Sequence, residues 1–124
     1  MFTIHEMSLM AELLYIVSED ARTRNIVQVH EITVVVGDLS NVLADALDLA
    51  FQYFQRQGST LINEYTKLQI IREVAKAKCP SCLFEFEPDY QIAFCPKCNG
   101  LNCVLVAGET FQVESYEGSV VFES

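Results

Sequence analysis

The sequence predicts an α+β fold, in which two helices pack on a small β-sheet and a short cysteine-rich domain is inserted. Apolar residues follow helical spacing in two segments and strand-like patterns in three others. All five cysteines and all three prolines lie in residues 76–104, which sets this segment apart. We therefore expect one α/β domain formed by residues 1–75 and 105–124, and a second domain formed by residues 76–104.

The first predicted helix follows the opening residues of the chain. Its buried face is predicted from residues at the spacing i, i+3, i+4, i+7 and i+11, namely Met10, Leu13, Leu14, Val17 and Ala21. Ser8 is predicted to cap the start of this helix. Arg22 and Arg24 suit the negative end of the helix dipole.

Two strands with a helix between them are predicted next. Residues 28–36 are rich in β-branched side chains, and residues 66–74 also have the pattern of a strand. Ser40 precedes the second helix, which is predicted over residues 41–56. The face expected to be buried consists of Leu43, Leu47, Ala50, Phe51 and Phe54.

A last strand is predicted after the cysteines, over the segment GETFQVESYE at residues 108–117. The small cysteine segment offers it little to pair with, so we expect this strand to return to the first sheet. The tail 117–124 contains Val120, Val121 and Phe122. An added edge strand, a contact between copies and a frayed end all remain open for it.

Composition and charge exclude several classes of protein. The chain has 124 residues and a formal net charge of −9, which disfavours binding to nucleic-acid phosphates. No apolar run reaches the roughly 18–20 residues that a membrane span needs. The N-terminus lacks the basic region and cleavage site of a signal peptide, so we expect a cytoplasmic protein. In a reducing compartment, paired cysteines indicate a metal site rather than disulfides.

The cysteines form two C-x-x-C pairs, Cys79 with Cys82 and Cys95 with Cys98, with 12 residues between them. Two such turns place four sulfurs around one ion, which predicts a structural, tetrahedral zinc site in a zinc-ribbon-like domain. Iron in a rubredoxin-like site and free thiols are the alternatives. Cys103 lies outside the pairs and is predicted to be a small core residue.

The chain has only two histidines. His30 lies inside a predicted strand and is expected to be a structural residue. His5 stands beside Glu6 near the chain start, where an imidazole, a carboxylate and backbone nitrogens can bind Ni(II) or Cu(II). Neither histidine has a nucleophile beside it in the sequence, so we expect a protein that is not an enzyme.

The order of these motifs is more specific than any one of them. The chain carries HEMSL at residues 5–9, VVVGDLS at 34–40, then CPSC, CPKC and the segment GETFQVESYE. This series resembles the HypA/HybF family, the nickel metallochaperones of [NiFe]-hydrogenase maturation. The resemblance extends to about residue 117.

The resemblance implies a two-domain protein with two metals. Nickel, as a transient cargo, would bind at His5 and Glu6. Zinc would be held by Cys79, Cys82, Cys95 and Cys98. The implied partners are a HypB-type GTPase and the hydrogenase large subunit, and some members of the family also serve urease maturation.

The chain departs from the family pattern immediately before His5. In the family the initiator methionine directly precedes the histidine and its amine is thought to bind nickel, whereas here Ile4 takes that place after Met1, Phe2 and Thr3. Three arrangements are open. The extension is an artefact of how the sequence was delimited, or it loops back to bring the Met1 amine to nickel. Otherwise nickel uses His5, its amide and the Glu6 side chain.

The sequence thus predicts a nickel carrier with a four-cysteine zinc site. No histidine lies in residues 76–104, so this site is expected to use cysteine ligands alone. A zinc-ribbon adaptor for protein–protein contact without nickel transfer, and a rubredoxin-like iron electron carrier, are the competing functions.

Overall fold

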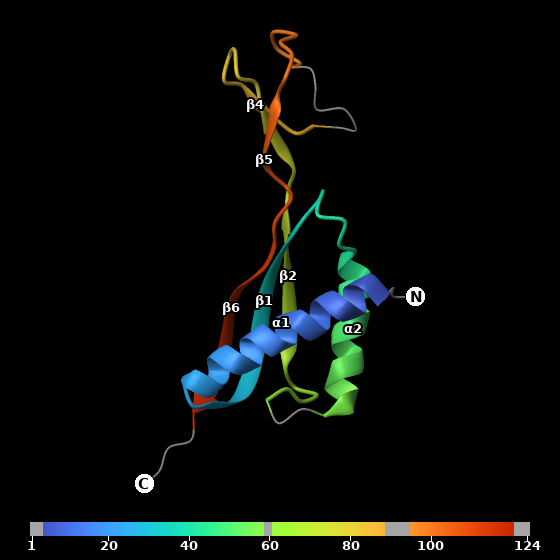
Figure 1. Cartoon of the computed structure of the whole chain (residues 1–124), viewed down its shortest axis with the longest axis vertical. Coiled ribbons are helices and arrows are strands. Elements are labelled where there is room, and N and C mark those ends of the chain that lie inside the picture. Colours follow the sequence, from blue (N-terminus) through green and yellow to red (C-terminus); the bar gives the residue numbers. More distant parts are fainter. Residues whose placement is uncertain (1–3, 59–60, 89–94, 121–124) are drawn as a thin grey trace.

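The computed structural model describes residues 4–58, 61–88 and 95–120, and it confirms the predicted α+β fold (Figure 1). Two helices and two small sheets make up this part of the chain. In order they are α1 (Ile4–Thr23), β1 (Ile26–Gly37), α2 (Ala44–Gln57), β2 (Lys67–Glu73), β3 (Lys76–Lys78), β4 (Glu85–Phe86), β5 (Val104–Ala107) and β6 (Phe111–Val120). Neither helix is long and apolar enough to cross a membrane.

The larger sheet has the strand order β2-β1-β6. Strand β1 runs parallel to β2, to which it is joined through α2, and antiparallel to β6. At the centre of the sheet, Val34 lies between Ile70 and Val113. The prediction that the strand after the cysteines returns to the first sheet is therefore confirmed.

Both helices help to cover this sheet: α1 contacts β1, β6 and α2, while α2 also contacts β2 (Figure 1). The buried face predicted for α1 is confirmed at all its positions: Met10, Leu13, Leu14, Val17 and Ala21. In α2, Leu47, Ala50 and Phe51 are buried as predicted, whereas Leu43 is 61% exposed. Leu43 is exposed because it precedes the helix as its N-cap residue.

The prediction that Ser8 caps the first helix is wrong, and the second helix begins later than its predicted start at residue 41. Helix α1 begins at Ile4, so Ser8 lies inside it. The helix begins before both Ser8 and the first residue of its periodic apolar face, Met10. Ser40 stabilises the preceding turn instead, since its Oγ donates to the carbonyl oxygen of Gly37 at 2.8 Å. Helix α2 then begins after Leu43, which makes no side-chain capping bond.

The second, smaller sheet has the order β4-β3-β5 and lies beyond the larger one along the long axis of the molecule (Figure 1). The chain crosses between the sheets twice, from β2 to β3 and from β5 to β6. At this crossing the Glu73 carboxylate accepts the backbone N–H groups of Gly108 (2.6 Å) and Thr110 (3.2 Å). It also accepts the Thr110 hydroxyl at 3.0 Å, so that one side chain holds both links together.

Close backbone packing explains the glycines at and beside this crossing. A Cβ on Gly37 would collide with the carbonyl oxygen of Gly108. Gly108 itself has φ +115°, and a Cβ there would lie 2.7 Å from the Cα of Ala75. Next to them, the Arg72 guanidinium makes two bonds to the Asp38 carboxylate, at 2.6 and 2.7 Å. The segment VGDLS at residues 36–40 thus packs against the two chain crossings between the sheets.

Candidate metal sites

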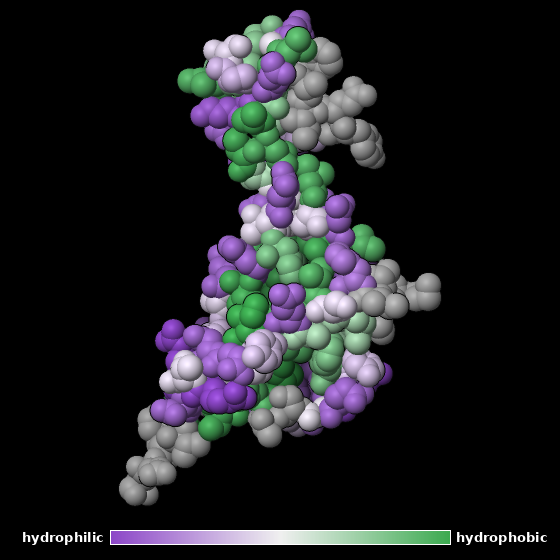
Figure 2. Space-filling view, in the orientation of Figure 1, coloured by the Kyte–Doolittle hydropathy of each residue, from purple (hydrophilic) through white to green (hydrophobic). Residues whose placement is uncertain are grey.

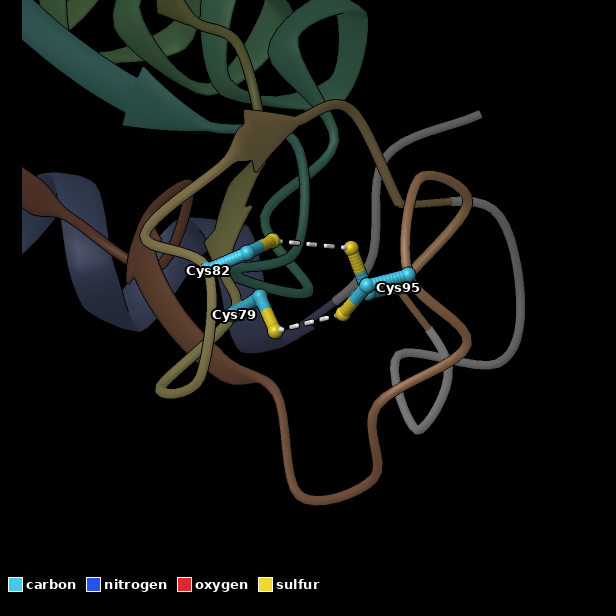
Figure 3. Close-up of side chains that lie close together, drawn as sticks. Cys79, Cys82 and Cys95 are labelled. Atoms are coloured by element: carbon cyan, nitrogen blue, oxygen red, sulfur yellow. Dashed lines mark hydrogen bonds between the residues drawn. The ribbon is translucent and has the colours of Figure 1, made fainter.

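The four cysteines of the two C-x-x-C pairs meet at one point, as predicted. Their Sγ atoms all lie within 4.8 Å of one another. Cys79 and Cys98 approach to 3.6 Å, as do Cys82 and Cys95 (Figure 3). Tetrahedral Zn–S bonds of about 2.3 Å place sulfurs about 3.8 Å apart, which these separations nearly match.

The two pairs are built by matching turns. In the first, the backbone N–H of Leu83 donates to the carbonyl oxygen of Cys79 at 2.9 Å. In the second, Asn99 donates to Cys95 at the same distance. Leu83 (φ 64°) and Asn99 (φ 58°), each directly after the second cysteine of its pair, have left-handed backbone conformations. A bulky leucine adopts such a conformation only where its surroundings compensate for the strain.

Backbone N–H groups stabilise thiolates in this cluster. N–H groups of Cys82 and Ser81 lower the pKa of Cys79 to about 6. Burial opposes ionisation of Cys95, yet N–H groups of Cys98 and Lys97 hold its pKa below the usual value. The cluster is thus prepared for a cation before one binds.

The fourth thiol shows why a cation completes the cluster. The Gly100 N–H favours the Cys98 thiolate, but the sulfurs of Cys79 and Cys82 raise its pKa to about 12. Four sulfurs this close cannot all ionise without a positive charge among them. The donor set and spacing therefore fit zinc, and four thiolates leave no position for a catalytic water.

Cys103 is not one of the four, but it lies closer to them than predicted. Its Sγ is half-buried and donates weakly to the carbonyl oxygen of Gly100 at 3.9 Å. Burial and then the neighbouring Cys79 raise the pKa of its thiol. Cys103 is thus a neutral neighbour of the cluster rather than a member of the apolar core.

His5 and Glu6 lie in the first turn of α1, with very different exposure. The His5 side chain is 56% exposed, whereas that of Glu6 is 2% exposed. Nδ1 of His5 lies 3.1 Å from Oε2 of Glu6. The same Oε2 accepts the backbone N–H of Leu43 at 3.3 Å. Although burial raises the pKa of Glu6, its bonds to His5 and Leu43 bring it below the usual value.

No sequence pattern connects Leu43 with Glu6, since 37 positions separate them. The only local signal is that α2 begins at a residue whose side chain cannot cap it. Residues 1–3, on which the three open arrangements for nickel binding depend, lie outside the described residues. His30 is an exposed strand residue whose Nε2 lies 3.2 Å from the Ser119 hydroxyl.

The structure does not bring the two sites together. Among the described residues, the four cysteines are the only group of three or more metal-binding side chains. His5 and Glu6 form a separate pair on α1.

Comparison with known proteins identifies the family of this chain. Residues 4–118 match the family model described as "Hydrogenase/urease nickel incorporation, metallochaperone, hypA". The hydrogenase maturation factor HypA of Moorella thermoacetica is 30% identical over 115 residues, covering 93% of this chain and 99% of that protein. HypA of Aquifex aeolicus is 32% identical over 114 residues, covering 92% and 96%.

Two solved structures share the fold. The solution structure of a HypA protein aligns with a TM-score of 0.69 at 22% identity, covering 96% of this chain and 99% of the other. That of the Ni metallochaperone HypA from Helicobacter pylori aligns with a TM-score of 0.64, also at 22% identity, covering 94% and 98%. On the match over residues 4–118, this chain belongs to the HypA family of hydrogenase/urease nickel-incorporation metallochaperones.

Proposed function

We propose that the protein binds Ni(II) as cargo at His5 and Glu6 and delivers it during [NiFe]-hydrogenase maturation. The observation that supports this proposal is the exposed imidazole of His5 held 3.1 Å from the buried carboxylate of Glu6. An ion that is to be passed on needs an accessible ligand, and His5 supplies one.

The start of a helix is a suitable place for a nickel site. The first four N–H groups of an α-helix have no partner within the helix, and His5 and Glu6 belong to the first turn of α1. Ni(II) accepts nitrogen ligands in square-planar geometry. In this proposal the ion takes the His5 imidazole and amide nitrogen with the Glu6 carboxylate. Few protein ligands make release to an acceptor possible.

The four-cysteine site has a different role in this proposal. Zinc held by Cys79, Cys82, Cys95 and Cys98 is structural and stabilises the domain of residues 76–104. The segment 76–104 is so small that it has too little core to fold without a metal. The nickel domain is then formed by residues 1–75 and 105–124. The protein acts as a carrier rather than as an enzyme.

Membership of the family supports a proposal for the partners. The proposed partners are a HypB-type GTPase and the hydrogenase large subunit, in the cytoplasm. The family model covers both hydrogenase and urease nickel incorporation, so urease accessory proteins are further candidates.

Nickel titration of two histidine variants tests the cargo site. The full, zinc-loaded chain is titrated with Ni(II) against a competing chelator, with His5→Ala and His30→Ala compared. His30→Ala is a matched control because His30 is also exposed but lies on β1. We expect one nickel per chain in the wild type and in His30→Ala, and none in His5→Ala. Equal nickel affinity in all three would refute the site.

A further inference from the structure

A groove runs between helix α1 and strand β6. Two adjoining hollows, of about 360 and about 850 Å³, share Ile16 and Val113 and together form it. The smaller hollow is lined mainly by apolar side chains, namely Leu9, Leu13, Ile16, Phe111 and Val113. Figure 2 shows hydrophobic surface next to α1 on this side of the molecule. Ile16 is 54% exposed, so an apolar anchor is available there.

One wall of the groove is the edge of a sheet. In the order β2-β1-β6, β6 pairs with β1 on one side and with no strand on the other within residues 4–58, 61–88 and 95–120. An edge strand of ten residues presents unpaired backbone N–H and C=O groups. These groups bind another extended chain by adding it as a further strand. The occupant that this edge favours is therefore extended.

The charges around the groove indicate which kind of extended chain can bind there. The residues that line it include four acidic ones, Glu12, Asp20, Glu114 and Glu117, against one arginine, Arg24, and one histidine, His30. Arg24 is already paired with Asp20 at 2.8 Å. The other three carboxylates make no ion pair within the described part of the chain.

This charge disfavours a second copy of the chain as occupant. Another copy would bring the same acidic strand against Glu114 and Glu117, and like charges across an interface are repulsive. Basic side chains would instead be attracted. The apolar anchor, the open edge and the unpaired carboxylates thus favour one kind of partner.

We propose that the α1–β6 groove is a docking site for an extended partner segment with alternating apolar and basic side chains. The segment pairs with β6 as a fourth strand. Its apolar side chains lie on the helix side, near Ile16 and Val113. Its basic side chains lie on the other face, near Glu117, which is paired across the sheet with Glu31. This surface is separate from His5 and Glu6, so the proposal holds whether or not that pair carries nickel.

A synthetic peptide tests the groove directly. The probe is a ten-residue peptide of alternating lysine and valine, blocked at both ends, which matches β6 in length. It is added to the zinc-loaded full chain and followed by NMR and calorimetry. We expect backbone amide shifts along β6 and the facing side of α1. An otherwise identical glutamate–valine peptide should not bind.

Two neighbouring variants distinguish peptide binding in the groove from nonspecific binding. Ile16→Asp places a charge in the groove, whereas Tyr15→Asp changes a 66% exposed residue that does not line it. We expect Ile16→Asp to weaken peptide binding by about tenfold or more, and Tyr15→Asp to leave it unchanged. Both positions are exposed, so both variants should remain folded. Glu117→Lys should also weaken binding, and added salt should do the same.

Three results would overturn the proposal. The first is that the lysine–valine peptide fails to bind. The second is that it binds Ile16→Asp and Tyr15→Asp equally well. The third is that sedimentation shows a wild-type dimer that Ile16→Asp abolishes, which would assign the groove to a second copy.

Discussion

The carboxylate of Glu6, in the first turn of helix α1, accepts the backbone N–H of Leu43 at the start of helix α2. One buried side chain thus supplies the cap that α2 lacks and at the same time lies 3.1 Å from the imidazole of His5. The Glu6 carboxylate therefore contacts both His5 and the start of the second helix.

Replacing Glu6 by alanine should destabilise the protein. The change leaves the Leu43 N–H without its acceptor and opens space at a side chain that is 2% exposed. Loss of a hydrogen bond to a charged group costs about 1–3 kcal/mol in the free energy of unfolding. Urea denaturation followed by circular dichroism measures the difference. Glu12→Ala, an exposed position on the same helix, should change stability by less than about 0.5 kcal/mol. Equal stability of Glu6→Ala and wild type would contradict the contact.

The Glu73 carboxylate should make stability depend on pH in the acid range. Its bonds from the Gly108 N–H and the Thr110 hydroxyl lower its pKa below 4.5 in the folded state. The unfolded chain therefore takes up this proton first as pH falls, so the stabilisation is present above about pH 4.5 and is lost below it.

Thermal unfolding of Glu73→Gln between pH 3 and pH 7 measures this contribution. The variant should melt below wild type at pH 7, and the difference should shrink as pH falls through the folded pKa. Glu109→Gln is the matched control, because Glu109 lies between Gly108 and Thr110 but is exposed. A constant difference for Glu73→Gln at all pH values would show that its charge is not the cause.

Zinc binding should depend on four of the five cysteines. Cys79→Ser removes a fully buried ligand and should abolish zinc in elemental analysis of the purified chain. Cys103→Ser should keep one zinc per chain, since Cys103 lies beside the cluster without belonging to it. Iron and a red colour in the wild type would favour the rubredoxin-like alternative.

Removal of zinc should affect the two sheets unequally. Chelation should increase amide exchange in β3, β4 and β5, because their segment has little core of its own. The sheet β2-β1-β6 should remain protected, since it is covered by α1 and α2. Simultaneous loss of protection in both sheets would show that zinc stabilises the whole protein.

Gly37→Ala should be more damaging than Gly58→Ala. The new Cβ at Gly37 would meet the backbone of Gly108, which cannot rotate away. Gly58 has φ +74° but nothing within 4 Å, so its cost should be limited to the backbone preference of about 1 kcal/mol. Urea midpoints of the two variants provide the comparison. A smaller loss for Gly37→Ala would be inconsistent with the close packing of the two chain crossings.

Features that depend on short sequence spacing could be predicted well. Helical periodicity identified the buried face of α1, and the C-x-x-C spacing identified four cysteines that meet in space. The return of β6 to the first sheet followed from the small size of the cysteine segment. The first two inferences need only residues that are close in the sequence. The third needs only a comparison of the segments that could pair with the last strand.

Contacts between distant backbone segments could not be predicted in this way. The bond to the Leu43 N–H at the start of α2 is supplied by Glu6 from another helix, and Ser40, which is nearer in the sequence, instead donates to Gly37. The bond from Gly108 to Glu73 likewise joins positions 35 apart. Hydrogen bonds of this kind can be recognised only when the positions of the helices and strands in space are known.

Nickel binding by the shortened chain is the most direct test of the central claim. Deletion of residues 1–3 with Ile4→Met places an initiator methionine directly before His5, and both this chain and the full chain are titrated with Ni(II) against a chelator. The account predicts one nickel per chain in each, lost from each by His5→Ala. Failure of both chains to bind nickel would contradict it, and would leave a zinc-stabilised protein without a cargo.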